Sequence, residues 1–344
     1  MLYKQNLTIQ NTTTKPADKN KPLFLTRPLV VCLLAGICCL LWGSAFPCVK
    51  IGYQLFHINT QDTASQLLFA GCRFALAGLL VLLFALIQGI PSNKNTSADS
   101  GENNTMQKLF PRHITTWKHI VILSFFQTIA QYFFFYIGLA HTSGVKASII
   151  VGTNVFVAIL TASLIFHQEK LTLSKVAGCL IGFLGVVLVN LGEDGLNLSM
   201  RFTGEGFIFL STIAYAFSSV IMKNFSQQEN PVLLSGWQFF IGGLVLIAVG
   251  GGLGGHVQSD NLFQVIMLLY LSFISAGAYT LWSILIKYNP VSQVAVYGFM
   301  NPVFGVILSW FLLQDSSQAL GINSILALIL VCFGIYVVNG IPAR

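Results

Sequence analysis

The chain has 344 residues, of which 55% are hydrophobic and only 8% are charged, and its mean hydropathy is +0.75. Soluble domains carry roughly a quarter charged residues, so this composition excludes an ordinary soluble protein. The formal net charge of +7 would also suit a nucleic-acid-binding protein. Here, however, the basic residues gather at the ends of long apolar runs, which favours a membrane protein without a nucleic-acid partner.

Ten apolar runs follow one another along the chain, each 19–24 residues long. A helix rises about 1.5 Å per residue, so each run can cross a hydrocarbon layer of about 30 Å. The runs are apolar on nearly all faces, whereas strands of a membrane barrel would be near 10 residues and alternate in polarity. The sequence predicts an all-α membrane protein with ten transmembrane helices at 29–50, 65–88, 117–138, 143–166, 173–191, 204–222, 232–250, 262–284, 291–313 and 320–340.

Basic residues are distributed unevenly between the two ends of these helices. With a cytoplasmic N-terminus and alternating helices, 14 of the 18 Lys and Arg residues fall on or beside the cytoplasmic side, whereas Asp and Glu split almost evenly. A bias of Lys and Arg alone is the positive-inside rule. We therefore expect a multi-pass protein of the cytoplasmic membrane with both termini in the cytoplasm. The polar segments 1–28 and 89–116 read as a disordered cytoplasmic tail and a flexible cytoplasmic loop.

The main sequence pattern occurs twice. The segment from Trp42 to Lys50 is echoed by Tyr215 to Lys223 at an offset of 173, and Leu68 to Phe74 by Leu233 to Phe239 at an offset of 165. Five helices per half is an odd number, so the second copy enters the membrane in the opposite direction. The sequence therefore predicts two inverted five-helix repeats, at 29–191 and 204–340, with a substrate site where they meet.

Several segments resemble the EamA module of the drug/metabolite transporter superfamily. They are Leu41-Trp42-Gly43-Ser44 with Phe46 in the first helix, Arg73 to Leu79 in the second, and Phe166 to Leu173 at the end of the fourth. The resemblance covers about residues 30–340. It implies a ten-helix exporter or exchanger of small metabolites, such as amino acids or related compounds, that works by alternating access.

Some positions depart from the family pattern. The family's proline near the start of the fourth helix is replaced by the region of Asn154, whereas the ninth helix keeps Pro302. The family's junction glycine is Gln168 here. If these residues shape a hinge, the two halves should move unequally. Glu169 and Asp315, at the ends of the fourth and ninth helices, are either solvated or capping residues, or they act with Pro302 in gating.

Arg73 is the basic residue that lies deepest within an apolar run. An arginine at mid-helix costs roughly 2.5–3.5 kcal/mol on the insertion scale, so its head group should face protein or water. It is either a counter-charge for a substrate carboxylate or phosphate, or it snorkels to the interface or hydrogen-bonds helix ends. Gln238 occupies the matching place in the second half, so recognition of charge would be one-sided.

Polar residues recur at helical spacing in the third and eighth helices. Gln127 and Gln131 lie four apart and match Ser275 and Tyr279 at an offset of 148, and Trp282 continues that face. Polar groups aligned in this way should point inward, where they either line a substrate cavity or hydrogen-bond a neighbouring helix. Six further residues are candidates for an amphipathic cavity wall, and the alternative for each is a lipid-facing or core position. They are Trp42, Asn154, Tyr215, Trp237, Tyr297 and Asn301.

Catalytic and metal-binding patterns are absent from the sequence. There is no His-Glu-x-x-His or Gly-x-Ser-x-Gly, the seven cysteines lack zinc-ligand spacing, and no Asp, Glu or His lies in the middle of an apolar run. We therefore expect no enzyme, no catalytic residue, no metal and no cofactor, and uniport or exchange rather than a proton relay. The expected partners are a small-molecule substrate and the lipid bilayer; a homodimer is left open. The alternative function is a channel or a non-transporting membrane scaffold.

Overall fold

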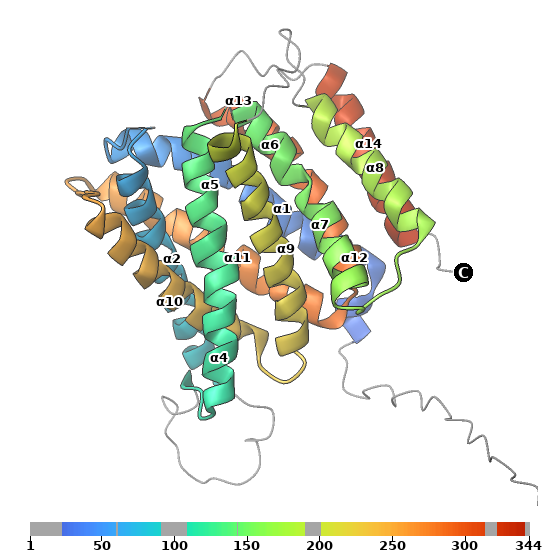
Figure 1. The fold of residues 1–344 in the computed structure, drawn as a ribbon, viewed down its shortest axis with the longest axis horizontal. Coiled ribbons are helices and arrows are strands. Elements are labelled where there is room, and N and C mark those ends of the chain that lie inside the picture. Colours follow the sequence, from blue (N-terminus) through green and yellow to red (C-terminus); the bar gives the residue numbers. More distant parts are fainter. Residues whose placement is uncertain are drawn as a thin grey trace, which may run out of the picture.

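The computed structural model describes residues 23–59, 61–90, 109–142, 144–189, 201–313 and 322–340. Every regular element in these ranges is a helix, which confirms the predicted all-α class (Figure 1). Most of the predicted tail at 1–28, residues 91–108 of the predicted loop, and Asp315 lie outside the described residues.

The helices follow one another much as the apolar runs predict. The first half contains η1 (Leu23–Thr26), α1 (Pro28–Leu55), α2 (Thr63–Ile87), α4 (Ile114–Leu123), η3 (Ser124–Ala130), α5 (Gln131–Ala140), α6 (Gly144–Gly152), α7 (Asn154–Leu160), η4 (Thr161–Ile165) and α8 (Leu173–Val189). The second half contains η5 (Phe202–Gly206), α9 (Phe207–Phe225), α10 (Pro231–Gly252), α11 (Leu262–Tyr288), α12 (Val291–Ala295), η6 (Val296–Phe299), α13 (Met300–Leu313) and α14 (Ile322–Gly340).

Length and hydropathy divide these helices into two groups. Helical stretches that are long and apolar enough to cross a membrane lie at Pro28–Leu55, Thr63–Ile87, Ile114–Leu139, Phe202–Gln228, Pro231–Gly252, Leu262–Tyr288 and Val291–Ser309. The other predicted spans correspond to shorter apolar helices at Ile149–Ile165, Leu173–Leu188 and Ile325–Gly340. Helices of this length cover roughly 25 Å, near the lower limit for a span. The multi-helix membrane fold is therefore confirmed, while the number of ten crossings stays a prediction.

Helix pairs match each other when the two halves are exchanged. Helix α2 packs along α10, and α8 packs along α14, as Figure 1 shows for both pairs. In the first half α1 contacts α11 and α13, and in the second half α9 makes the corresponding contacts with α5 and α7. This exchange relation indicates an internal two-fold symmetry between the two halves.

Glycines allow the two self-matching pairs to pack backbone against backbone. A Cβ placed on Gly71 of α2 would lie 2.6 Å from the backbone nitrogen of Ile247 on α10. A Cβ on Gly178 of α8 would lie 2.7 Å from the carbonyl oxygen of Gly334 on α14. Gly178, Gly182 and Gly185 form a stripe of small residues on α8, and a Cβ at each would come within 3 Å of a neighbouring helix.

Two matching helices are interrupted near their middle. The fourth predicted helix breaks at Thr153, whose hydroxyl donates to the carbonyl of Ile150 at 2.6 Å, and α7 then begins at Asn154. The ninth predicted helix passes through the tighter turn of η6 just before Asn301. Interrupted helices at matching positions of two repeats are typical of transporters whose site lies at that depth.

We name the two ends of the bundle after residues near the ends of α1. The Arg27 end is where α1 begins, directly after Arg27, and the Lys50 end is where α1 ends, just beyond Lys50. At the Lys50 end, the Asp62 carboxylate accepts a hydrogen bond from the backbone N–H of Ser65 at 3.0 Å and caps α2. Hydrogen bonds from Ser65 lower the pKa of Asp62 below its usual value. Gln264 takes part in the capping box of α11 and donates to the carbonyl of Leu55 at 2.6 Å, which joins α11 to the end of α1.

The α2–α10 contact predicts opposite effects for two glycine substitutions on the same helix. Gly243→Ala would place its Cβ 2.9 Å from the Gly71 carbonyl oxygen, whereas a Cβ at Gly251 meets nothing within 4 Å. Overpacking of this kind costs about 1–3 kcal/mol, so Gly243→Ala should unfold at a lower temperature in detergent. Gly251→Ala should unfold at the wild-type temperature or above, because alanine favours a helix by roughly 1 kcal/mol. Equal unfolding temperatures for Gly243→Ala and wild type would contradict the close contact.

Candidate functional site

An aromatic cluster centred on Tyr279 joins helices from both halves. The Tyr279 ring on α11 lies 4.9 Å from the Trp42 ring on α1 and 5.1 Å from the Phe239 ring on α10. Its hydroxyl lies 2.6 Å from the hydroxyl of Tyr132 on α5. Trp282, one turn along α11, stacks edge-on against Trp42 at 5.0 Å. We call these residues the Tyr279 cluster.

Arg73 lies beside this cluster, and its head group is buried rather than extended to water. Its side chain is only 4% exposed, and Nε donates to the Ser275 hydroxyl at 2.9 Å and to the carbonyl of Leu271 at 3.2 Å. The hydroxyls of Tyr132 and Tyr279 lie within electrostatic range of the guanidinium. Hydrogen bonding to a neighbouring helix is therefore observed. These bonds use the single Nε hydrogen, and the Tyr136 hydroxyl on α5 also hydrogen-bonds the Arg73 side chain. The guanidinium has five N–H donors, so an anion at the terminal nitrogens is compatible with these contacts.

The positive charge of Arg73 has no carboxylate partner within the described part of the chain. Ion pairs there join Lys175 to Glu169 and His119 to Glu229, and neither includes Arg73. A buried charge is costly unless it is paired and hydrogen-bonded. Arg73 is therefore a buried cation whose observed contacts are hydrogen bonds to neutral groups.

Several predicted site residues carry buried polar atoms that lack a hydrogen-bond partner among the described residues. These atoms are Trp42 Nε1, Gln127 Oε1, Gln131 Oε1, Gln238 Nε2 and Asn301 Oδ1. Buried polar groups are satisfied in the great majority of cases. Atoms of this kind are therefore the groups that a bound polar molecule would satisfy.

The polar faces predicted on the third and eighth helices meet within the bundle. Gln127 lies in η3, where the helix widens to the π-helical turn that is frequent at functional sites. Gln131 reaches the Tyr279 hydroxyl, and Ser275 holds Arg73. Tyr215 packs against the same group of side chains from α9. The structure thus brings together Trp42, Arg73, Gln131, Tyr215, Ser275, Tyr279 and Trp282.

Other predicted site residues lie elsewhere or tie helices together. Trp237 donates from Nε1 to the carbonyl of Leu109 at 3.0 Å and belongs to a separate apolar cluster with Ile120. Gln238 accepts a hydrogen bond from the Thr128 hydroxyl at 2.8 Å, which joins α10 to η3. Tyr297 is buried against α1, where its carbonyl accepts from Cys39.

Asn154 and Asn301 follow the two helix interruptions, and both are partly buried. Pro302 is buried in the first turn of α13.

Sequence reasoning missed the aromatic neighbours Tyr132 and Phe239. Both belong to apolar runs, Tyr132 in the segment Gln131-Tyr132-Phe133-Phe134-Phe135-Tyr136, where no spacing distinguishes it from lipid-facing residues. The signal that was available is position, because Tyr132 directly follows the predicted site residue Gln131.

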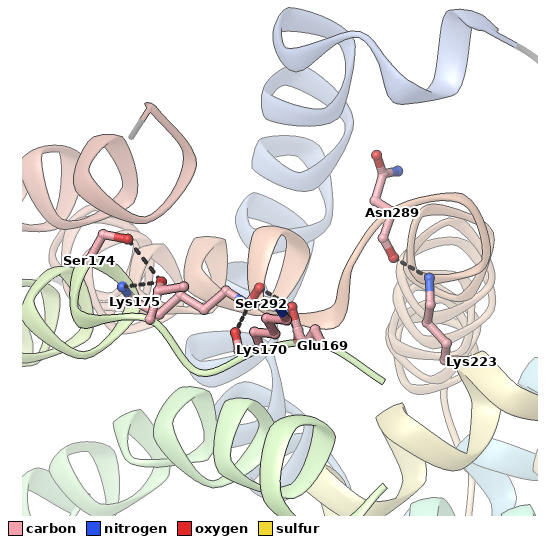
Figure 2. Close-up of polar contacts among 8 residues, drawn as sticks. Glu169, Lys170, Ser174, Lys175, Lys223, Asn289 and Ser292 are labelled. Atoms are coloured by element: carbon pink, nitrogen blue, oxygen red, sulfur yellow. Dashed lines mark hydrogen bonds and ion pairs between the residues drawn. The ribbon is translucent and has the colours of Figure 1, made fainter. Parts of the chain in front are cut away.

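A second group of polar contacts closes the Arg27 end of the bundle (Figure 2). The Glu169 carboxylate accepts hydrogen bonds from the backbone N–H of Ser292 at 2.9 Å, from the Ser292 hydroxyl, and from Lys175 Nζ at 2.7 Å. Its side chain is 8% exposed, so of the two structural roles expected for Glu169 it has the capping one and is not solvated. It caps α12, whose first N–H groups have no partner within the helix.

Three further hydrogen bonds complete this group. Gln168 Nε2 donates to Asn224 Oδ1 at 2.7 Å, and Lys223 Nζ donates to the carbonyl of Ile286 at 2.8 Å and to that of Asn289. Figure 2 shows Lys223 and Asn289 on one side of this end and Glu169, Lys175 and Ser292 on the other. Segments 168–175, 220–224 and 286–292 therefore hold one another in a closed triangle, which we call the Arg27-end junction.

Comparison with known proteins decides the family. The model of the EamA-like transporter family matches residues 29–191 and again residues 202–340. The chain belongs to the EamA-like transporter family. This confirms the resemblance seen in the sequence and assigns the two-repeat membrane fold of that family.

Curated relatives, several of them named uncharacterized transporters, share limited identity with this EamA-like protein. A chloroplastic WAT1-related protein of Arabidopsis thaliana is 25% identical over 81% of this chain, and the match spans 63% of the plant protein's own length. An uncharacterized transporter of Archaeoglobus fulgidus is 26% identical over 82% of this chain and 89% of its own. The match to a solved crystal structure covers 90% of this chain and 96% of the solved chain, with a TM-score of 0.70 and 17% sequence identity. At this identity the match shows the fold alone.

Proposed function

We propose that this protein is a secondary transporter, an exporter or exchanger of small organic metabolites such as amino acids or related compounds. The observation that carries the proposal is the Tyr279 cluster with Arg73. Here α1, α2 and α5 of one repeat meet α10 and α11 of the other around buried polar atoms that lack partners. A site between two repeats, with buried polar groups that a ligand would satisfy, suits a carrier.

The chemistry of the site supports a substrate with a carboxylate. Arg73 supplies positive charge in a buried setting, and the Trp42 indole supplies an unpaired N–H donor. Gln131, which reaches the Tyr279 hydroxyl, supplies an amide oxygen for a donor group on the same molecule. The aromatic rings of Trp42 and Phe239 offer contact to an apolar portion of the substrate.

Alternating access follows from the two-repeat architecture in this proposal. The repeats are inverted, so exchanging their conformations closes one end of the bundle and opens the other around a site that stays in the middle. The interruptions at Thr153 and at η6 provide matching positions at which helices can bend. We place the ten crossings in the cytoplasmic membrane, with the Arg27 end and both termini in the cytoplasm, on the distribution of Lys and Arg.

Counterflow tests the proposed function directly. Proteoliposomes that contain the purified protein are preloaded with one unlabelled amino acid and then given the same amino acid in radiolabelled form. For at least one of the standard amino acids, the label should accumulate transiently and saturably. A channel would equilibrate the label without saturation, and a scaffold would show no uptake. Either result across the whole set would contradict a carrier of these metabolites.

Removal of the Arg73 charge should impair transport of a carboxylate substrate. Arg73→Ala loses a charge-assisted hydrogen-bonding group, which corresponds to a loss of about tenfold or more in affinity. Arg73→Lys keeps the charge and should retain part of the affinity, and Lys50→Ala, which removes an exposed cation, should leave it unchanged. Counterflow at graded substrate concentrations measures the affinity, and membrane yield checks insertion. Wild-type affinity in Arg73→Ala would remove Arg73 from the binding site.

A further inference from the structure

The Arg27-end junction joins the two repeats through side chains. Glu169 and Gln168 belong to the first repeat, whereas Ser292 and Asn224 belong to the second. The contacts between the repeats include charge-assisted hydrogen bonds from the backbone N–H and the hydroxyl of Ser292 to the Glu169 carboxylate, whose side chain is only 8% exposed. Such bonds are stronger than neutral ones. The repeats cannot separate at this end unless these bonds break.

A packed apolar layer lies beneath the junction. Leu285, Ile286, Val291 and Val294 are each at most 1% exposed, and they pack in one cluster with Trp282 of the Tyr279 cluster. These buried side chains therefore connect Trp282 of the Tyr279 cluster to the junction without a break in the packing. A carrier with alternating access must open a route through this packing in its other state.

We propose that the Arg27-end junction is the gate on that side of the membrane, with the Glu169 carboxylate as the group that holds it shut. This inference rests on the proposed carrier function. Glu169 is the hub because one carboxylate binds the start of α12 in the second repeat and Lys175 at the start of α8 in the first. Gln168 and Lys223 close the remaining sides of the triangle. Loss of the Glu169 charge therefore shifts the conformational equilibrium toward the state that is open at the Arg27 end.

Thiol labelling in lipid nanodiscs tests this gate. Ser219 lies on α9 between Tyr215 and the junction and is 5% exposed, so Ser219→Cys in a cysteine-free background reports opening at the Arg27 end. Glu169→Gln should raise the rate at which a maleimide labels Ser219→Cys by about tenfold or more. The substitution removes charged hydrogen bonds that stabilise the closed state alone, so the open state becomes more populated. Ser292→Ala, which removes the hydroxyl bond and keeps the N–H bond, should give a smaller rise.

Glu205→Gln is the matched control at the opposite end. Glu205 is also a buried carboxylate, and it accepts hydrogen bonds from Thr142 and from the backbone N–H of Arg201 at 2.7 Å. Its substitution should leave labelling of the Ser219→Cys reporter unchanged. Wild-type labelling in Glu169→Gln, or an equal rise in Glu205→Gln, would overturn the gate, since the second result indicates general loosening.

A reversible cross-link provides a test that does not depend on the stability of Glu169→Gln. Gln168 and Asn224 side chains are in hydrogen-bond contact, so a short reducible reagent with two thiol-reactive ends should join Gln168→Cys to Asn224→Cys in a cysteine-free background. The cross-link should abolish counterflow, and reduction should restore it, whereas Gln168→Cys alone should keep its counterflow after the same treatment. Full counterflow in the cross-linked protein would overturn the gate and leave the carrier function standing. Absence of counterflow in the wild type would instead contradict the carrier function itself.

Discussion

A polar group inside a lipid bilayer has no water to bond, and this constraint governs the whole structure. It restricts the described chain to helices, whose backbone groups satisfy one another, and it makes close glycine-mediated packing of α2 on α10 and of α8 on α14 favourable. Polar side chains in such a protein must find partners on neighbouring helices. Most of them do, as Ser124, Thr128 and Ser275 show. The exceptions near Tyr279 are informative for that reason.

Duplication explains the frame of the molecule, and departures from it explain its chemistry. Exchange of the two repeats maps α1 onto α9 and α2 onto α10, and the helix contacts follow that exchange. The side chains do not. Arg73 holds α11 through Nε, whereas Gln238, its counterpart, joins α10 to η3. The two repeats supply matching frameworks, and in the proposed function the buried Arg73 gives the site between them a positive charge that Gln238 does not match.

Much of the fold could be predicted from the sequence because the bilayer imposes a strong and simple pattern. Apolar runs gave the helices, and the spacing of Gln127, Gln131, Ser275 and Tyr279 indicated faces that turn inward. The partners of those faces were harder to predict. Arg73 binds a backbone carbonyl of Leu271, and a carbonyl carries no sequence signal. Ser292 is 123 residues from Glu169, and their contact depends on how the two repeats pack. Trp237 shares its residue type with Trp42, yet only Trp42 lies in the Tyr279 cluster, since helix rotation decides which aromatic faces inward.

The central claim is that the two repeats enter the membrane in opposite directions and share one site between them. The sidedness of three exposed positions tests it most directly: Phe24 before the first repeat, Arg201 before the second, and Gly340 at the end of the second. Each is replaced by cysteine in a cysteine-free background and labelled with a membrane-impermeant reagent in vesicles of known orientation. The account predicts Phe24→Cys and Gly340→Cys labelled from one side and Arg201→Cys from the other. Labelling of Phe24→Cys and Arg201→Cys from the same side would contradict it.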